Sequence, residues 1–191
     1  DIEIDATDVD HFVSTVKAIA PTFGGINLED IKAPVAFEIE RRLKEELDIP
    51  VMHDDQHGTA IISAAAMLNA LELTSRDIKD VRIVVSGAGA AAMSCLELYM
   101  KLGLQKKNVA IFDSKGHVCH ERDNLDERKS EFSSKKQYKN LKEALDGADI
   151  FLGLSKGGLV DADMINGMAA NPIVFALANP EPEIPYAEAV K

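Results

Sequence analysis

The stretch RIVVSGAGAAA, residues 82–92, decides the fold of this chain. Its first five residues form a short β-branched run typical of a buried strand, and residues 90–102 have helical periodicity. Between them, residues 87–92 fit the pattern G-x-G-x-x-G/A, with Ala92 in the last position. In such a strand, turn and helix, Gly87 permits the tight turn and Ala92 keeps helix and strand close together.

The same alternation continues toward the carboxyl end. Further buried strands are predicted at residues 108–112, 149–153 and 173–177, and further helical segments at residues 141–145 and 161–169. Their spacing leaves room for crossover helices between parallel strands. The sequence therefore predicts an α/β fold with a Rossmann-type, doubly wound parallel sheet.

This turn predicts a dinucleotide site. Gly89 lets a pyrophosphate approach the backbone, and the free N–H groups that open the following helix attract its charge. Asp113, at the end of the next strand, is an acid able to accept hydrogen bonds from the adenosine ribose. It would repel the 2′-phosphate of NADP, but Lys115 lies two residues on and compensates electrostatically. The choice between NAD and NADP stays open.

A different region precedes the predicted sheet. Val35, Ile39 and Leu43 recur at helical spacing after Pro34, which suits a first helical position. A second helix, rich in small apolar residues, is expected at residues 59–73. We expect two parts: residues 1–75, a partial substrate- and metal-binding region with inter-domain helices, and residues 76–191, the dinucleotide-binding domain.

Two other features are expected to carry no chemistry of their own, and the role of a third is left open. Residues 114–137 are charge-rich and are interpreted as a solvated surface excursion after the second strand. Cys95 and Cys119 show neither metal-ligand nor disulfide spacing. Ser155 lies in a glycine-containing segment that is equally consistent with a cofactor-lining loop and a simple turn.

Two pairs of acids form a second constellation. Glu29 and Asp30 precede one predicted helix, and Asp54 and Asp55 lie in HDDQHGT, residues 53–59. Convergent carboxylates suit Mg²⁺ or Mn²⁺, which take oxygen ligands and keep open positions. Taken alone, Glu29 and Asp30 are more simply explained as favourable charges near a helix N-terminus. The histidines flanking the second pair leave a softer metal open.

Composition narrows the class of partner. The chain has 191 residues and a formal net charge of −11, which argues against nucleic acid or an anionic membrane surface. It contains no unbroken apolar stretch near the roughly 18 residues that span a bilayer. Its acidic first residues are unlike a targeting segment. We therefore expect a cytoplasmic protein acting on small molecules.

Four blocks together resemble the bacterial-type malic enzymes: FGGINLEDI (23–31), HDDQHGTA (53–60), the turn at residues 87–92 and FALANP (175–180). The resemblance implies metal-dependent oxidative decarboxylation of L-malate to pyruvate and CO₂, with reduction of NAD or NADP. It implies Mg²⁺ or Mn²⁺ on Glu29, Asp30 and Asp55, with Asp54 a catalytic carboxylate that pairs with a lysine. The residues expected on the dinucleotide are Gly87, Ala88, Gly89, Ala90, Ala91, Ala92, Asp113 and Asn179.

The family also uses a tyrosine and a lysine for proton transfer, for which we find no match in this chain. We therefore expect a truncated core that turns over malate negligibly by itself, and a homodimer in the full-length protein. Two other functions stay open: a non-catalytic nucleotide-sensing module, which has no use for the acidic pairs, and a metal-independent hydroxy-acid or amino-acid dehydrogenase.

Overall fold

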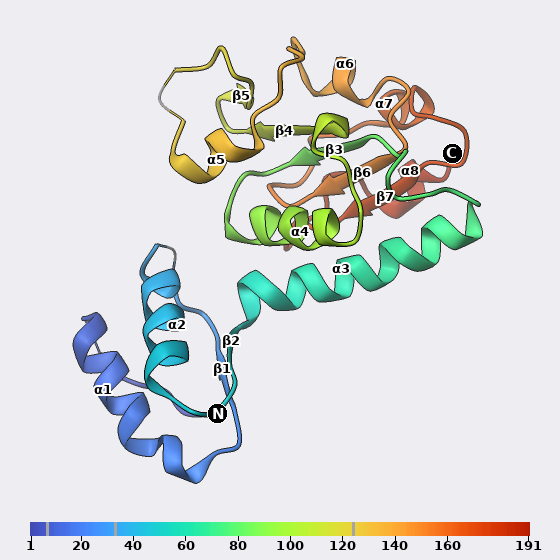
Figure 1. Ribbon diagram of the computed structural model, residues 1–191. Helices are drawn as coiled ribbons and strands as arrows, with labels where there is room; N and C mark the ends of the chain where they lie inside the picture. The colour runs from blue at the N-terminus through green and yellow to red at the C-terminus, as the bar shows by residue number, and fades with distance from the viewer. Residues whose placement is uncertain (7, 33, 124) are drawn as a thin grey trace. The chain divides into compact units, whose positions relative to one another are not determined.

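The computed structural model describes residues 1–6, 8–32, 34–123 and 125–191 (Figure 1). The chain divides into two compact units, Asp1–Thr59 and Ala60–Lys191. The division lies within one long helix, α3 (Asp54–Leu73), and not at residue 75 as expected. The reason is that Ala60, Met67 and Leu71 on this helix are buried in the core of the second unit. In the described part of the chain, no helix is long and apolar enough to cross a membrane.

The first unit consists of two helices and a small parallel sheet. Its elements are α1 (Val9–Ile19), the 3₁₀ turn η1 (Ala20–Thr22), β1 (Ile26–Leu28), α2 (Val35–Glu46), β2 (Val51–His53) and the start of α3. The side chain of Asp8 caps α1 by accepting from the His11 N–H at 2.8 Å. The predicted apolar stripe of α2 is buried at Ile39 and Leu43, which pack with residues of α1, β1 and β2.

Helix α3 begins earlier than expected. We predicted its start after Gly58, but Asp54 and Asp55 already form its first turn. Carboxylates are favourable there because the amino end of a helix carries partial positive charge. Gly58 lies inside the helix, and a Cβ atom at this position would lie 2.3 Å from Asp54 Oδ1. The glycine thus leaves space for that carboxylate.

The second unit contains the predicted sheet. Its strands are β3 (Ile83–Ser86), β4 (Val109–Asp113), β5 (Gly116–His117), β6 (Ile150–Gly153) and β7 (Ile173–Ala176), in the order β5-β4-β3-β6-β7. All neighbours pair in parallel except β4 and β5. The remaining elements are α4 (Ala90–Lys101), η2 (Lys106–Asn108), α5 (Glu127–Phe132), α6 (Leu141–Leu145), α7 (Ala162–Asn166) and α8 (Tyr186–Ala189). The Rossmann-type prediction is confirmed.

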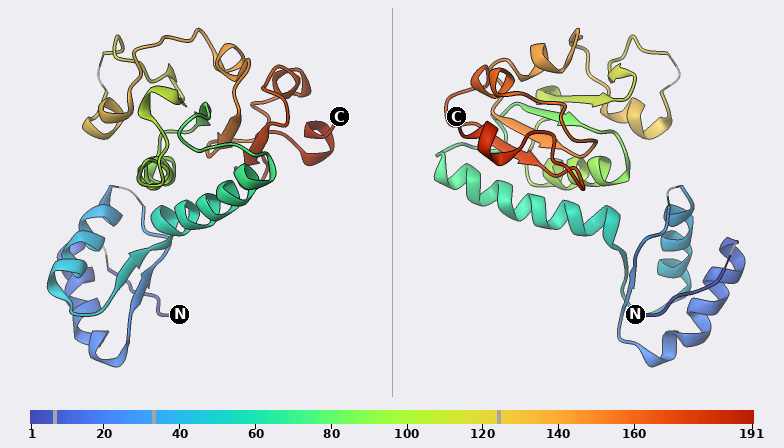
Figure 2. Two further views of the ribbon diagram at one scale, coloured as in Figure 1. Left: turned by 45° about the vertical axis from the view of Figure 1, so that its right-hand side comes forward. Right: turned by 180° about the vertical axis from the view of Figure 1, so that it is seen from behind.

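Helices cover both faces of this sheet (Figures 1 and 2). Ile83 and Val85 of β3 pack with α3 and α4 on one face, whereas Val84 between them packs with α6 and α7 on the other. Successive strand residues point to opposite faces, so a strand that is apolar throughout must be covered on both sides. Coverage on both faces therefore explains why these strands appear in the sequence as continuous apolar runs.

The segment 114–137 is more ordered than expected for a solvated excursion. It includes β5 and α5, and Val118, Cys119 and Phe132 are buried. Cys119 forms a parallel bridge with Ser134, which ties the segment back to the edge of the sheet. Isolated apolar residues between charges have no periodicity, so their burial was not visible in the sequence. Both cysteines of the chain are buried and form no disulfide.

Candidate functional site

The glycine-rich turn connects β3 to α4. Gly87 has a φ of +116°, and a Cβ atom there would lie 2.4 Å from the carbonyl oxygen of Leu154. Its N–H donates to the Phe112 carbonyl at 2.8 Å, which anchors the turn to β4. Only glycine satisfies both the left-handed backbone and the close approach. Gly89 differs, because a Cβ atom there would meet nothing within 4 Å.

The space beside Gly89 is bordered by the amino end of α4. Gly89 is the N-cap of this 12-residue helix, and no side chain caps the first turn. Ala88, Ala90 and Ala91 are small and partly exposed, whereas Ala92 is buried against the sheet. Uncapped N–H groups and the helix dipole make this position suited to an anion such as a phosphate.

Asp113, at the carboxyl end of β4, is already bound to a partner that the sequence did not suggest. Arg122 donates to Oδ1 at 2.8 Å and to Oδ2 at 2.7 Å. The Lys115 backbone N–H donates to Oδ1 at 2.8 Å, and Lys129 Nζ lies 3.4 Å from Oδ2. Burial raises the pKa of Asp113, but these hydrogen bonds and charges outweigh it and lower the pKa to about 2.

Arg122 was missed because it lies in the segment interpreted as solvated. It also donates to the backbone carbonyls of Gly116 and His117, at 3.3 and 3.4 Å. Its side chain is only 18% exposed, and that of Asp113 is 10% exposed. The pair therefore holds the β4–β5 turn in place and compensates the acidic charge at the end of β4.

A second buried carboxylate connects the loops that follow β6 and β7. Glu183 is fully buried, and it accepts from the backbone N–H of Ser155 at 2.9 Å and of Ala178 at 3.1 Å. Ser155 Oγ lies 2.8 Å from Ser86 Oγ, so the loop after β6 also contacts the end of β3. Gly153 leaves space for this arrangement, because a Cβ atom there would lie 2.3 Å from the Glu183 carboxyl carbon.

Glu183 thus ties together the carboxyl ends of β3, β6 and β7, where open α/β sheets bind ligands. The sequence suggested a role for Asn179 but none for Glu183, because a single acid in a proline-containing segment has no recognisable pattern. The structure places Asn179 directly after Ala178, exposed, in the loop that Glu183 holds. Ser155 is likewise part of this arrangement and not of an isolated turn.

The two acidic pairs of the first unit meet because β1 and β2 are parallel. Leu28 of β1 is paired with His53 of β2. Glu29 and Asp54 are the next residues of the two paired chains, so they leave the sheet side by side. The charge of Asp54 is the main cause of a raised pKa at Glu29, followed by burial and the charges of Asp30 and Asp55. Asp30 has a φ of +55°, a left-handed conformation that aspartate adopts more readily than most residues.

These carboxylates fit a hard divalent cation by the chemistry of their donors. All four offer oxygen atoms, and the raised pKa of Glu29 reports a repulsion that a cation would relieve. Within the ranges that the structure describes, no three His, Cys, Asp or Glu side chains are arranged tightly enough to form a complete ligand set. Glu29 and Asp30 also line a hollow of about 830 Å³ in the first unit.

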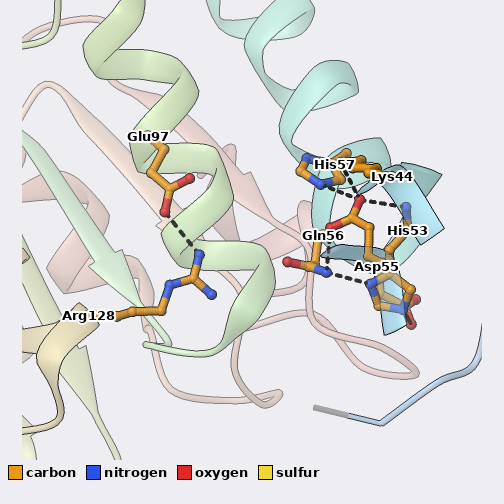
Figure 3. A network of polar contacts seen from close by, with 8 residues as sticks. Lys44, His53, Asp55, Gln56, His57, Glu97 and Arg128 are labelled. Carbon is orange, nitrogen blue, oxygen red and sulfur yellow. Dashed lines mark hydrogen bonds and ion pairs between the residues drawn. The ribbon is translucent and has the colours of Figure 1, made fainter. Parts of the chain in front are cut away.

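The two histidines of this region have another partner (Figure 3). His57 Nε2 lies 2.8 Å from Glu40 Oε1, and Glu40 accepts from the His53 backbone N–H at 3.1 Å and from Lys44 Nζ at 2.8 Å. Burial raises the pKa of Glu40, but Lys44 and His57 lower it by more. Gln56 Nε2 is 3.0 Å from His53 Nδ1. The His57 ring and the His53 backbone thus stabilise Glu40, whereas the His53 ring lies 3.5 Å from Asp55 Oδ2 through its Nε2 atom.

The sheet order, the glycine turn and the acid at the end of β4 define a Rossmann-type α/β protein. Residues 56–190 match the family model described as malic enzyme, NAD binding domain, and residues 3–44 match malic enzyme, N-terminal domain. The chain therefore belongs to the malic enzyme family.

Named relatives agree with this assignment. The chain is 53% identical to an NADP-dependent malic enzyme and also 53% identical to an NAD-dependent malic enzyme of Rhizobium meliloti, in each case over 96% of this chain and 24% of the relative. It is 42% identical to the NAD-dependent malic enzyme of Thermotoga maritima, with a TM-score of 0.89 over 99% of this chain and 51% of that one. The chain thus spans about a quarter of the Rhizobium proteins. Overall similarity does not distinguish the two cofactors.

Proposed function

We propose that this chain is the dinucleotide-binding core, with part of the metal-binding region, of an enzyme that oxidises and decarboxylates L-malate to pyruvate and CO₂ while reducing NAD or NADP. The observation that carries the proposal is the open, uncapped amino end of α4 beside Gly89, in a segment that matches the family's NAD-binding domain. The full-length protein is proposed to act as a cytoplasmic homodimer.

In this proposal the second unit binds the dinucleotide. The N–H groups around Gly89, Ala90 and Ala91 bind the pyrophosphate, with Ala88 beside it and with Gly87 and Ala92 supporting the turn. Asn179 contacts the nicotinamide ribose from the loop that Glu183 holds. When bound, the dinucleotide accepts the hydride removed from C2 of malate.

Asp113 is proposed to accept a hydrogen bond from the adenosine ribose through a lone pair that Arg122 leaves free. Because Arg122 and Lys129 compensate its charge, Asp113 does not exclude a 2′-phosphate. We therefore expect both NAD and NADP to bind. Arg122→Gln should weaken NADP binding more than NAD binding, which titration calorimetry with the two dinucleotides measures. Equal weakening would contradict this part of the proposal.

The first unit is proposed to hold Mg²⁺ or Mn²⁺ on Glu29, Asp30 and Asp55. When bound, the cation would favour loss of the C2 hydroxyl proton and stabilise the negative charge that develops as CO₂ leaves. Asp54, held over Gly58, is the proposed catalytic carboxylate and orients a proton-transferring lysine by pairing with it. The support is the convergence of these acids at the ends of β1 and β2.

Titration calorimetry of NAD, NADP and Mn²⁺ into the chain tests both parts. Gly89→Val should abolish dinucleotide binding without unfolding the chain, because the added side chain enters open space that the pyrophosphate would fill. Asp55→Asn should abolish Mn²⁺ binding and leave dinucleotide binding intact. Dinucleotide binding without any Mn²⁺ binding would favour a nucleotide-sensing module, and chelator-insensitive malate oxidation would favour a metal-independent dehydrogenase.

A further inference from the structure

A hollow of about 520 Å³ lies at the end of the sheet opposite the glycine turn. It is lined by Val109, the first residue of β4, whereas Asp113 ends that strand. Four residue steps along a strand correspond to about 13 Å. The hollow therefore lies apart from the proposed dinucleotide site, although both belong to the second unit.

The lining of this hollow is basic in a chain that is strongly acidic. It includes five permanent cations and one histidine: Arg82, Lys106, Lys107, Lys135, Lys136 and His120. None of the lining residues is Asp or Glu. The whole chain carries 21 Lys and Arg against 32 Asp and Glu, so this concentration of positive charge runs against the overall balance.

In the ranges that the structure describes, these cations have no carboxylate partner. The Arg82 guanidinium donates to the backbone carbonyl of Asp146, and its Nε is buried without a hydrogen-bond partner in the described part of the chain. Charges gathered without counter-charges favour an anionic ligand.

The segments that carry the lysines are held in place. Ser134 bridges to Cys119 and bonds through its backbone N–H to Val118 O at 3.2 Å. Tyr138 is buried, and its backbone N–H donates to His117 Nδ1 at 3.3 Å. Lys136 Nζ lies 4.4 Å from the Tyr138 ring centroid, so the ring already has a cation over it. Much of the exposed wall of the hollow is apolar, so its charge comes from the lysine and arginine head groups.

We propose that this hollow is a binding site for a small polyphosphate-bearing anion, separate from the dinucleotide site. Lysines act as point charges for phosphate groups, and several lysines around one hollow suit several phosphates. The volume falls in the range of small-molecule sites and exceeds what a single phosphate would fill. A free polyphosphate and a nucleoside polyphosphate share this chemistry.

Titration calorimetry of sodium tripolyphosphate and of ATP into the full chain, in the presence of a chelator, tests the proposal. We expect saturable binding to one site that weakens as ionic strength rises. Lys135→Glu/Lys136→Glu and, separately, Lys106→Glu/Lys107→Glu should each weaken it by about tenfold or more, because each reverses two charges at the hollow. Equal affinity for tripolyphosphate and ATP would show that the site recognises the phosphates alone. Tighter binding of ATP would show that the nucleoside also makes a contact.

Two controls distinguish binding at this hollow from a general charge effect and from binding at the glycine turn. Lys101→Glu/Lys142→Glu makes the same charge change at positions that do not line the hollow, and it should have little effect. Gly89→Val should leave tripolyphosphate binding intact. Absence of saturable binding, equal weakening by the control pair, or loss of binding in Gly89→Val would overturn the proposal.

Discussion

The acidic side chains at two sets of strand ends, one in each unit, lie in opposite electrostatic environments. At the ends of β1 and β2, Glu29 lies among other carboxylates and its pKa is raised. At the end of β4, Asp113 is paired with Arg122 and its pKa is lowered to about 2. Among the described residues, no Lys or Arg forms an ion pair with the first group, whereas Arg122 of the chain itself pairs with Asp113. Carboxylates at parallel strand ends are therefore candidates for holding a metal cation only where the fold leaves their charge uncompensated.

Glu183 is the most deeply buried acid of the three and should give the largest effect. In Glu183→Gln the amide NH₂ must face the N–H of Ser155 or of Ala178, which places a donor against a donor in a buried site. We expect a loss of about 2–4 kcal/mol in the free energy of unfolding. Denaturant unfolding measures it, with Glu188→Gln on the exposed face of α8 as the control. Equal midpoints for the two variants would show that Glu183 does not hold the loops.

The Asp113–Arg122 pair should give an intermediate, pH-dependent effect. Because the folded pKa of Asp113 is about 2 and its ordinary value is 3.8, the pair stabilises the fold above about pH 4 and loses this contribution as the pH falls toward 2. The shift corresponds to about 2 kcal/mol.

Arg122→Gln should therefore lower stability at neutral pH by about 1–2 kcal/mol, since Lys129 remains near Asp113, and flatten the dependence on pH between 4 and 2. Unfolding curves across this range measure the effect. Arg128→Gln, which breaks the more exposed pair with Glu97 shown in Figure 3, is the matched control. An unchanged pH dependence in Arg122→Gln would contradict the pairing.

The contribution of Glu29 to stability should change with pH in the direction opposite to that of Asp113. Glu29 has a raised folded pKa, so its contribution is full below the ordinary value of 4.5 and is lost as the pH rises through the folded pKa. Glu29→Gln should therefore raise the melting temperature slightly at neutral pH in a chelator, and abolish stabilisation by Mn²⁺. Glu38→Gln, a substitution of another acid in the first unit, should change neither. A lower melting temperature for Glu29→Gln would contradict the repulsion.

Gly58→Ala should have the smallest effect on stability. Its main effect should be on Mn²⁺ binding by the acidic group, through the position of Asp54. Alanine favours a helix by up to about 1 kcal/mol over glycine, while its Cβ atom would displace the Asp54 carboxylate. We expect a stability change within about 1 kcal/mol and weaker Mn²⁺ binding, measured by thermal melting and calorimetry. Unchanged Mn²⁺ affinity would show that the position of Asp54 is unimportant for the cation.

Local patterns predicted the architecture well. The four parallel strands begin and end within one residue of the expected positions, because a strand covered on both faces requires a continuous apolar run. The ends of elements were harder to predict. Helix α3 starts at Asp54 and not at residue 59, because the carboxylates of its first turn resemble a loop in the sequence. The segment 114–137 was misread because its buried residues, such as Val118 and Phe132, have no periodicity.

The sequence by itself determined the turn at Gly87, the parallel sheet and the family, because strand period, glycine position and motif order are properties of neighbouring residues. Only the tertiary structure decided which charge meets which. Arg122 reaches Asp113 across 9 residues, Glu183 reaches Ser155 across 28, and Arg82 and Lys136 come to line one hollow. Such pairings depend on how distant segments pack, and the same packing decides whether a carboxylate or a lysine is left for a ligand.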